Sequence, residues 1–202
     1  MTIRALVFDF GGVLLRTEDH SPRIALAKRF GLSEGELERL VFASSSSIRA
    51  SLGELDVEEH WREVVRTLGA GESDIETIKT EFFAGDRLDE RLVMYLRQMR
   101  NQYHIGLLSN AWSDLRSFLH HRLGILDMFD EAVISAEVKM MKPQVEIYHY
   151  TARKLGVAPH EAVFVDDMQE NVEGARAAGM QAILFRDANQ LFAELNDLIQ
   201  KV

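Results

Sequence analysis

Five short apolar runs constrain the fold of this chain more than any other feature of its sequence. They are rich in β-branched and aromatic residues, and they occupy residues 3–10, 103–110, 132–135, 162–167 and 181–185. Such runs predict strands, and their nearly continuous hydrophobicity is typical of a parallel sheet that is covered on both faces. Because amphipathic helical segments lie between them, the sequence predicts an α/β fold with a doubly wound parallel sheet.

Two of the intervening segments carry clear helical signals. In 89–102, an apolar stripe at helical spacing is formed by Leu92, Val93, Leu96 and Met99. The segment 143–156 begins with Pro143, which is favoured in the first turn of a helix, and it ends at Gly156. Both segments are therefore predicted to be helices that pack on the sheet.

Residues from about 18 to 86 break the alternation of strand and helix. Capping residues predict helix starts at Ser21-Pro22, at Ser33 with Glu36, at Asp56 with Glu59 and at Ser73 with Glu76. No run in this part has the pattern of a strand, and the serine-rich stretch 43–51 fits either a flexible linker or the start of a helix. We therefore predict an α/β core domain formed by residues 1–17 and 87–202, with an all-helical insertion at 18–86.

Composition narrows the class of protein. A chain of 202 residues with 47% hydrophobic residues can bury a substantial core, and the absence of cysteine excludes disulfides and thiolate metal sites. No segment approaches the roughly 20 apolar residues of a membrane span, and the apolar run near the N-terminus is too short for a signal peptide. A cytoplasmic protein with no membrane partner is therefore expected.

The charge of the chain limits its partners. The formal net charge is −9 and the basic residues are scattered, whereas binding to a nucleic-acid backbone requires clustered Lys and Arg. We therefore expect no nucleic-acid partner. An acidic protein that binds a small anion needs a local positive centre, which is either a metal ion or a well-placed lysine.

Polar side chains follow three of the predicted strands. Asp9 follows the first, Ser109 and Asn110 end the second, and Asp166 and Asp167 end the fourth. Each residue alone is ordinary at a strand end, where such residues form turns and cap helices. Two adjacent carboxylates after an apolar strand repel each other unless a cation is present, and an oxygen-liganded ion such as Mg²⁺ would remove that cost. The sequence thus indicates a ligand site at the carboxyl edge of the sheet.

The order of these elements resembles that of a known family. Asp9 in "FDFGGVL", Ser109 in "LLSN", Lys142 in "MMKP" and the aspartate pair in "VFVDDMQENVEGA" are similar to the four motifs of the haloacid dehalogenase-like (HAD) hydrolase superfamily. The helical insertion lies where that family carries its type-1 cap. The resemblance implies a Rossmann-like core with strand order 3-2-1-4-5 and a hydrolase acting on phosphoric monoesters.

The resemblance also implies roles for the motif residues. Asp9 would be the nucleophile, Ser109 and Asn110 would bind the substrate phosphate, and Lys142 would neutralise charge on both the nucleophile and the phosphate. Mg²⁺ would be held by Asp9, the backbone carbonyl of Gly11 and Asp167, with Asp166 as a second acidic partner. Asn171 would hold a metal-bound water from the opening turn of a helix.

Gly11 departs from the usual pattern of the family's phosphatases, which carry a second aspartate there as general acid. Its loss should slow the departure of a poor leaving group, because general acid catalysis typically contributes about 10²–10⁴-fold. A branch that resembles sugar-1-phosphate phosphatases has a glycine at the same place. The chain also offers other acids, namely Glu18, Asp19, His20 and, within the insertion, His60. Gly11 and Gly12 are expected to shape a tight turn after Asp9.

The leading hypothesis is a Mg²⁺-dependent phosphatase that hydrolyses a small phosphorylated metabolite, a sugar phosphate among the candidates, through an aspartyl-phosphate. One alternative is a non-catalytic phosphate-binding or regulatory protein. A 2-haloacid dehalogenase is disfavoured, because two adjacent carboxylates would repel a haloacid. Substrate choice would reside in the insertion, where Arg49, Trp61 and Phe82 are candidate contacts, the last two more readily explained as core. The sequence leaves the substrate and the oligomeric state open.

Overall fold

A computed structural model describes residues 2–200, of which residue 200 is described by its backbone alone. The centre of the structure is a parallel five-stranded sheet. The strands are β1 (Ala5–Phe8), β4 (His104–Ser109), β5 (Glu131–Ile134), β6 (Ala162–Asp166) and β7 (Gln181–Leu184). Their spatial order is β5-β4-β1-β6-β7, and every neighbouring pair is parallel. Numbered in chain order these strands run 3-2-1-4-5, so the predicted fold class and strand order are confirmed.

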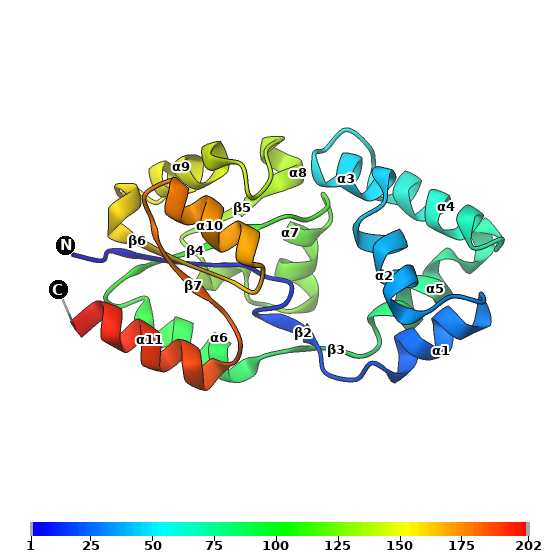
Figure 1. Cartoon of the computed structure of the whole chain (residues 1–202), viewed down its shortest axis with the longest axis horizontal. Coiled ribbons are helices and arrows are strands. Elements are labelled where there is room, and N and C mark those ends of the chain that lie inside the picture. Colours follow the sequence, from blue (N-terminus) through cyan, green and yellow to red (C-terminus); the bar gives the residue numbers. More distant parts are fainter. Residues whose placement is uncertain (1, 201–202) are drawn as a thin grey trace.

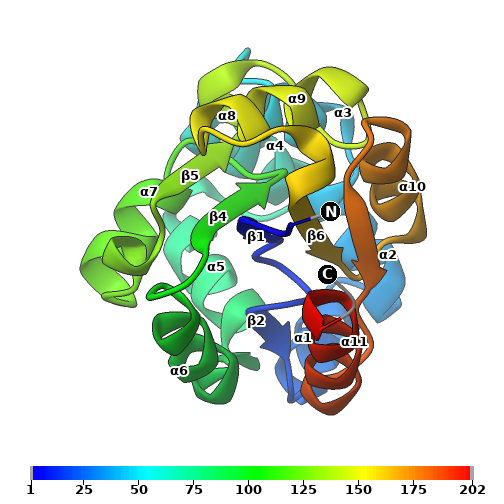
Figure 2. The same ribbon diagram turned by 90° about the vertical axis from the view of Figure 1, so that its left-hand side faces the viewer.

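Helices cover both faces of this sheet (Figure 2). On one face lie α6 (Glu90–Met99) and α11 (Ala188–Gln200), and on the other lie α9 (Val145–Lys154) and α10 (Gln169–Ala177). The alternation of side chains along β1 divides the core, since Leu6 and Phe8 pack with the first pair of helices while Ala5 and Val7 pack with the second. Burial on both faces explains why the strands are continuously hydrophobic.

The helical insertion lies beyond one end of the sheet (Figure 1). It consists of α1 (Ser21–Arg29), α2 (Glu34–Phe42), α3 (Ser45–Ser51), α4 (Val57–Thr67) and α5 (Ile75–Phe83). These helices bury an apolar cluster of their own, which includes Trp61 and Phe82. The interpretation of Trp61 and Phe82 as core residues is therefore confirmed, since both are fully buried.

Two short strands carry the chain into and out of the insertion. Antiparallel β2 (Leu15–Thr17) and β3 (Asp86–Leu88) pair with each other, and Thr17 Oγ1 donates a hydrogen bond to Asp86 Oδ1 at 2.8 Å. The expectation of no strand up to residue 86 was wrong at its edge, because Asp86 belongs to β3. Three residues with mixed polarity are too few to produce an alternating pattern.

The predicted helix starts had different outcomes. The capping box of Ser33 and Glu36 is present, and Ser33 accepts a hydrogen bond from the backbone of Glu36 at 3.3 Å. Asp56 precedes α4 without a side-chain cap. The start at Ser73 was wrong, because Asp74 instead accepts a hydrogen bond from Gly71 N at 3.1 Å and closes a turn that delays α5 until Ile75.

Three other predictions from the sequence also have clear outcomes. The helix expected at Ser21-Pro22 begins at Ser21. The serine-rich stretch 43–51 is the start of a helix rather than a linker, since α3 begins at Ser45 and Ser44 caps it. The placement of Pro143 in the first turn of a helix was wrong, since α9 begins at Val145 after a turn in which Gln144 N donates to Met141 O at 3.0 Å.

The remaining elements are short. They are α7 (Leu115–Ser117) and α8 (Ser135–Val138), with single turns of 3₁₀ or π helix at 72–74, 118–122, 126–128 and 159–161. Within residues 2–200, the structure contains no helix with the length and apolarity that crossing a membrane would require.

Candidate active site

The site forms where β1 and β6 end side by side. Asp9 directly follows β1 and Asp166 ends β6, and Asp9 N extends the ladder between these strands with a hydrogen bond to Val165 O at 2.9 Å. Lys142 reaches the same place from the loop before α9. Its Nζ lies 2.8 Å from Asp9 Oδ1 and 2.7 Å from Asp166 Oδ2. The structure thus brings together three predicted site residues from three separate segments.

These three charged side chains are almost fully buried. The side chain of Lys142 is 1% exposed, that of Asp9 10% and that of Asp166 0%. Burial raises the pKa of Asp9 to about 7, against the opposing effect of Lys142. Burial disfavours the charged form of Lys142, but the two carboxylates outweigh it and raise the pKa of Lys142. The lysine is therefore held as a cation between two acids, and one buried cation does not balance both carboxylates when they are ionised.

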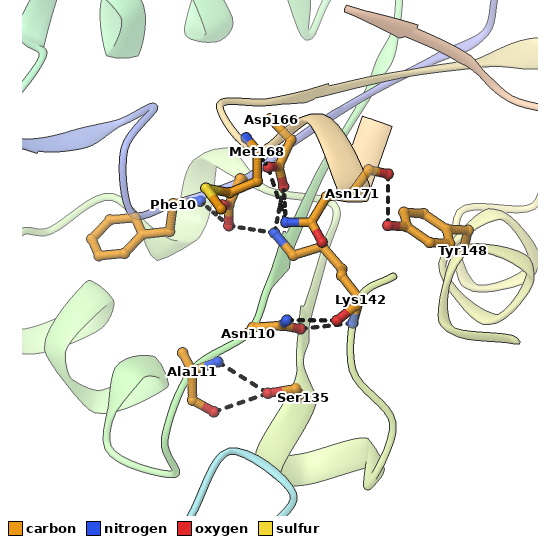
Figure 3. Close-up of polar contacts among 10 residues, drawn as sticks. Phe10, Asn110, Ala111, Ser135, Lys142, Tyr148, Asp166, Met168 and Asn171 are labelled. Atoms are coloured by element: carbon orange, nitrogen blue, oxygen red, sulfur yellow. Dashed lines mark hydrogen bonds and ion pairs between the residues drawn. The ribbon is translucent and has the colours of Figure 1, made fainter. Parts of the chain in front are cut away.

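Asp166 is fixed by donors on both of its oxygens (Figure 3). Besides Lys142, the backbone N–H of Met168 donates to Oδ1 at 2.8 Å, and Asn171 Nδ2 lies 3.0 Å from Oδ1 and 3.1 Å from Oδ2. Asn171 lies in the first turn of α10, as expected, and the partner that the structure gives its amide is Asp166. Its predicted contact with a metal-bound water stays a prediction.

A third carboxylate completes the cluster. Ligand oxygens of Asp9, Asp166 and Asp167 all lie within 4.8 Å of one another, and Asp167 is exposed while the other two are buried. Three carboxylates at this spacing, with a single lysine among them, form a donor set suited to a hard divalent cation. The residues present therefore fit the Mg²⁺ site that the sequence predicted.

The two glycines that follow Phe10, Gly11 and Gly12, differ in backbone conformation and in the space around them. Gly12 has φ +80°, and a Cβ built on it would lie 2.2 Å from Asp167 Oδ2. At Gly11, by contrast, a Cβ would meet nothing within 4 Å. The positive φ of the turn favours glycine at position 12, and a Cβ there would also displace the carboxylate of Asp167. Gly11 leaves an open space at the position of the expected general acid.

We expect Gly12→Ala to displace Asp167 and to weaken metal binding by at least about 10-fold, because the new methyl group occupies the place of the carboxylate. The positive φ should also cost about 1–2 kcal/mol of folding free energy. Titration of phosphate release with Mg²⁺, together with calorimetric titration with Mn²⁺, measures the first effect. Gly31→Ala is the matched control, because Gly31 has φ +71° and open space around it in the insertion; it should cost similar folding free energy and leave the metal affinity unchanged. Equal metal affinity in the two variants would contradict the placement of Asp167.

The other side of the site is built from the end of β4. Ser109 is buried at this strand end. Asn110 holds the loop that carries Lys142, since its Nδ2 donates to Lys142 O at 2.9 Å and its Oδ1 accepts from Lys142 N at 2.8 Å. The side-chain amide of Asn110 therefore positions Lys142. The predicted contact between Asn110 and the phosphate is left to the backbone of Asn110.

Ser135 is a structural residue of the site that the sequence did not indicate. Ala111 N donates to Ser135 Oγ at 3.0 Å, and Ser135 Oγ lies 3.2 Å from Ala111 O, so this hydroxyl fixes the loop after Ser109 (Figure 3). In the sequence Ser135 ends an apolar run, and nothing there distinguishes it from an ordinary strand residue. Its role depends on the parallel pairing of β4 with β5.

The four candidate replacements for the general acid are engaged in other contacts. Glu18 accepts from Arg16 at 3.0 Å, Asp19 accepts from Ser21 N at 2.9 Å, and His20 pairs with Glu34. His60 is fully buried in the insertion, where its Nδ1 lies 2.9 Å from Ser46 Oγ. None of these contacts directs an acid toward Asp9.

The buried position of His60 predicts a pH dependence of stability. Burial lowers the pKa of His60 from 6.5 to about 4. Between these values the unfolded chain binds a proton that the folded chain does not, so stability falls as pH decreases from about 6.5 to about 4. Relative to a His60→Gln variant, the wild type should lose up to about 3 kcal/mol over this range. Urea denaturation at several pH values measures the difference. His149→Gln, at an exposed position, is the control substitution. A difference between the wild type and His60→Gln that stays constant over this pH range would contradict the prediction.

Several relatives of this chain are named as phosphatases. A family model described as "Hydrolase: haloacid dehalogenase-like hydrolase" matches residues 3–179. The chain is 25% identical over 202 residues to the sesquiterpene phosphatase astK of Aspergillus oryzae, a match that covers 98% of this chain and 97% of that protein. It is 26% identical over 187 residues to the D-ribitol-5-phosphate phosphatase of Bacteroides thetaiotaomicron, covering 89% of this chain and 90% of that protein.

Solved structures share the fold. The HAD family enzyme bt-2542 of Bacteroides thetaiotaomicron, in complex with magnesium and inorganic phosphate, has a TM-score of 0.75 at 22% identity, covering 94% of this chain and 99% of that one. A predicted HAD-like family hydrolase from Porphyromonas gingivalis has a TM-score of 0.79 at 22% identity, with 98% of each chain covered. The family and the enzyme class expected from the four motifs are confirmed: this chain belongs to the haloacid dehalogenase-like hydrolase family.

Proposed function

We propose that this protein is a Mg²⁺-dependent phosphatase that hydrolyses a small phosphorylated metabolite through an aspartyl-phosphate on Asp9. The observation that carries the proposal is the placement of Lys142 Nζ, 2.8 Å from Asp9 and 2.7 Å from Asp166. A lysine held as a cation beside the nucleophile offsets the repulsion between the Asp9 carboxylate and an incoming phosphate anion.

Asp9 is the proposed nucleophile. A carboxylate oxygen forms a bond to phosphorus in line with the ester oxygen, and the bond between phosphorus and that ester oxygen breaks. The leaving oxygen keeps the bonding electrons and takes a proton from water. Water then hydrolyses the aspartyl-phosphate, which releases orthophosphate and restores the carboxylate. Ser109 and the backbone after it are proposed to donate hydrogen bonds to the phosphoryl oxygens.

The metal is proposed to be held by Asp9, the carbonyl oxygen of Gly11 and Asp167. When bound, Mg²⁺ would supply positive charge for the phosphoryl oxygens. We assign Asp166 chiefly to orienting Lys142, because both of its oxygens already accept hydrogen bonds. Asn171 supports that orientation from α10. This division leaves the exposed carboxylate, Asp167, as the one that takes the metal together with Asp9.

The substrate is proposed to be a small phosphate ester rather than a nucleic acid, in a cytoplasmic setting. The two phosphatases compared above are named for different compounds, a sesquiterpene and D-ribitol 5-phosphate, so they support the ester class. We assign residues 18–86 as a cap over the α/β core and propose that it selects the ester, with the exposed Arg49 as a candidate contact. The open space at Gly11 favours esters whose leaving group needs little protonation.

Phosphate release tests the proposal. Para-nitrophenyl phosphate and a panel of sugar phosphates should be hydrolysed in the presence of Mg²⁺, and activity should disappear with EDTA and return with added Mg²⁺. Esters with good leaving groups should react faster than simple alkyl esters. Phosphate release that is unaffected by EDTA, or no release from any member of the panel, would contradict the proposed function.

A further inference from the structure

Trp112 joins the core domain to the apolar cluster of the helical insertion. It lies on the loop between β4 and α7, yet its ring packs in a cluster whose other described members all fall between Leu26 and Phe83. Its centroid is 4.7 Å from that of His60, 5.9 Å from Trp61 and 6.1 Å from Phe42, on which it stacks. Its Nε1–H donates to Ser47 Oγ at 3.3 Å. The core domain thus inserts an aromatic side chain into the insertion.

A backbone contact lies beside this aromatic one. Gly53, just after α3, has φ +65°, and a Cβ built on it would lie 2.2 Å from Ala136 O in α8. In Figure 1, α3 and α8 adjoin across the gap between the two parts of the chain, whereas β2 and β3 cross that gap elsewhere. The insertion is therefore attached at its strand pair and again at α3.

The loop that carries Trp112 is the loop that builds one side of the active site. Asn110 holds the backbone of Lys142, and Ala111 is fixed by Ser135, the first residue of α8. Trp112 is the next residue. A continuous chain of contacts therefore runs from Lys142 through Asn110 and Ala111 to Trp112, and from there into α3 and α4.

We propose that Trp112 is a positioning residue that fixes the helical insertion at one orientation over the phosphate-binding side of the site. The insertion cannot rotate about β2 and β3 without withdrawing the indole from its aromatic contacts, and buried aromatic pairs resist such separation. The docking of Trp112 into the insertion does not depend on the reaction that the site catalyses. The effect of this docking on substrate binding rests on the proposed function.

The absence of cysteine allows the orientation to be measured directly. Spin labels on Glu59→Cys in α4 and His149→Cys in α9, both exposed positions, report the distance distribution between the insertion and the core. Trp112→Ala should broaden this distribution, and Trp112→Phe, which retains a ring, should restore most of it. Phe192→Ala removes an aromatic that packs on Tyr95 in the core and is the matched control, with no broadening expected.

A second variant covers the case in which Trp112→Ala fails to fold. Gly53→Ala should shift the same distance distribution, because its methyl group collides with the backbone of Ala136. Unchanged distributions in Trp112→Ala, or in Gly53→Ala where the former does not fold, would overturn the docking. This readout stands even if no phosphate is released, so it separates the docking from the proposed function.

Kinetics test the positioning role itself. For para-nitrophenyl phosphate we expect Trp112→Ala to raise KM at least about 5-fold with kcat changed less than about 2-fold, because a disoriented insertion loses uniform substrate binding. Trp112→Phe should recover KM. Broadened distances with unchanged KM and kcat would show that Trp112 docks the insertion without positioning it for catalysis, which would overturn the proposal.

Discussion

Asp9→Asn should reduce phosphate release by at least about 10³-fold, because the amide cannot form the aspartyl-phosphate on which both proposed steps depend. The replacement has nearly the same shape, and its side-chain oxygen can still accept from Phe10 N, which lies 2.7 Å from Asp9 Oδ1. The fold should therefore persist. Rates with para-nitrophenyl phosphate at saturating Mg²⁺, with circular dichroism of both proteins, measure the effect.

The matched control for this change is Asp127→Asn, which removes a carboxylate that is 78% exposed. It should leave the rate within about 2-fold of the wild type, as expected for a surface substitution. Substantial hydrolysis by folded Asp9→Asn would rule out Asp9 as nucleophile. The remaining function of the site would then be binding of phosphate rather than its transfer.

Lys142→Met should both inactivate and destabilise the protein. Methionine preserves much of the buried stem but leaves Asp9 and Asp166 without their shared cation. Removing one partner from a buried ion pair typically costs about 3–5 kcal/mol. Activity should fall by at least about 10²-fold, the usual scale for losing a preorganised charge at a reacting centre. Urea denaturation and phosphate-release rates measure the two effects separately.

Lys154→Met is the control for the loss of stability. Lys154 is 46% exposed and lies 3.8 Å from Glu131, so its replacement should cost less than about 1 kcal/mol. Adding Asp166→Asn to Lys142→Met should recover part of the stability but none of the activity, since it removes one unpaired carboxylate. The destabilisation should also shrink as pH falls, because an unpaired buried carboxyl group can take up a proton. Equal costs for the two lysine variants would contradict the buried triad.

Hydrophobic pattern alone was sufficient for most of the sheet. The runs at 3–10, 103–110 and 162–167 contain β1, β4 and β6 because residues buried on both faces of a parallel strand must be apolar throughout. The two short strands that connect the insertion to the core, β2 and β3, were missed because their sequences lack such an apolar pattern. Leu15–Thr17 and Asp86–Leu88 are held by pairing with each other, which leaves little mark on either local sequence.

For the site, the sequence determined which carboxylates gather, because Asp9 and Asp166 end adjacent parallel strands and such ends share one edge. The family resemblance added Lys142, and only the tertiary structure decided which contacts hold the site together. Lys142 reaches Asp166 across 24 positions, Asn110 holds Lys142 across 32, and Trp112 reaches Ser47 across 65. The burial of a strand can be predicted from its own composition. A contact between distant loops depends on how the packed elements orient them, so the sequence of either loop does not identify its partner.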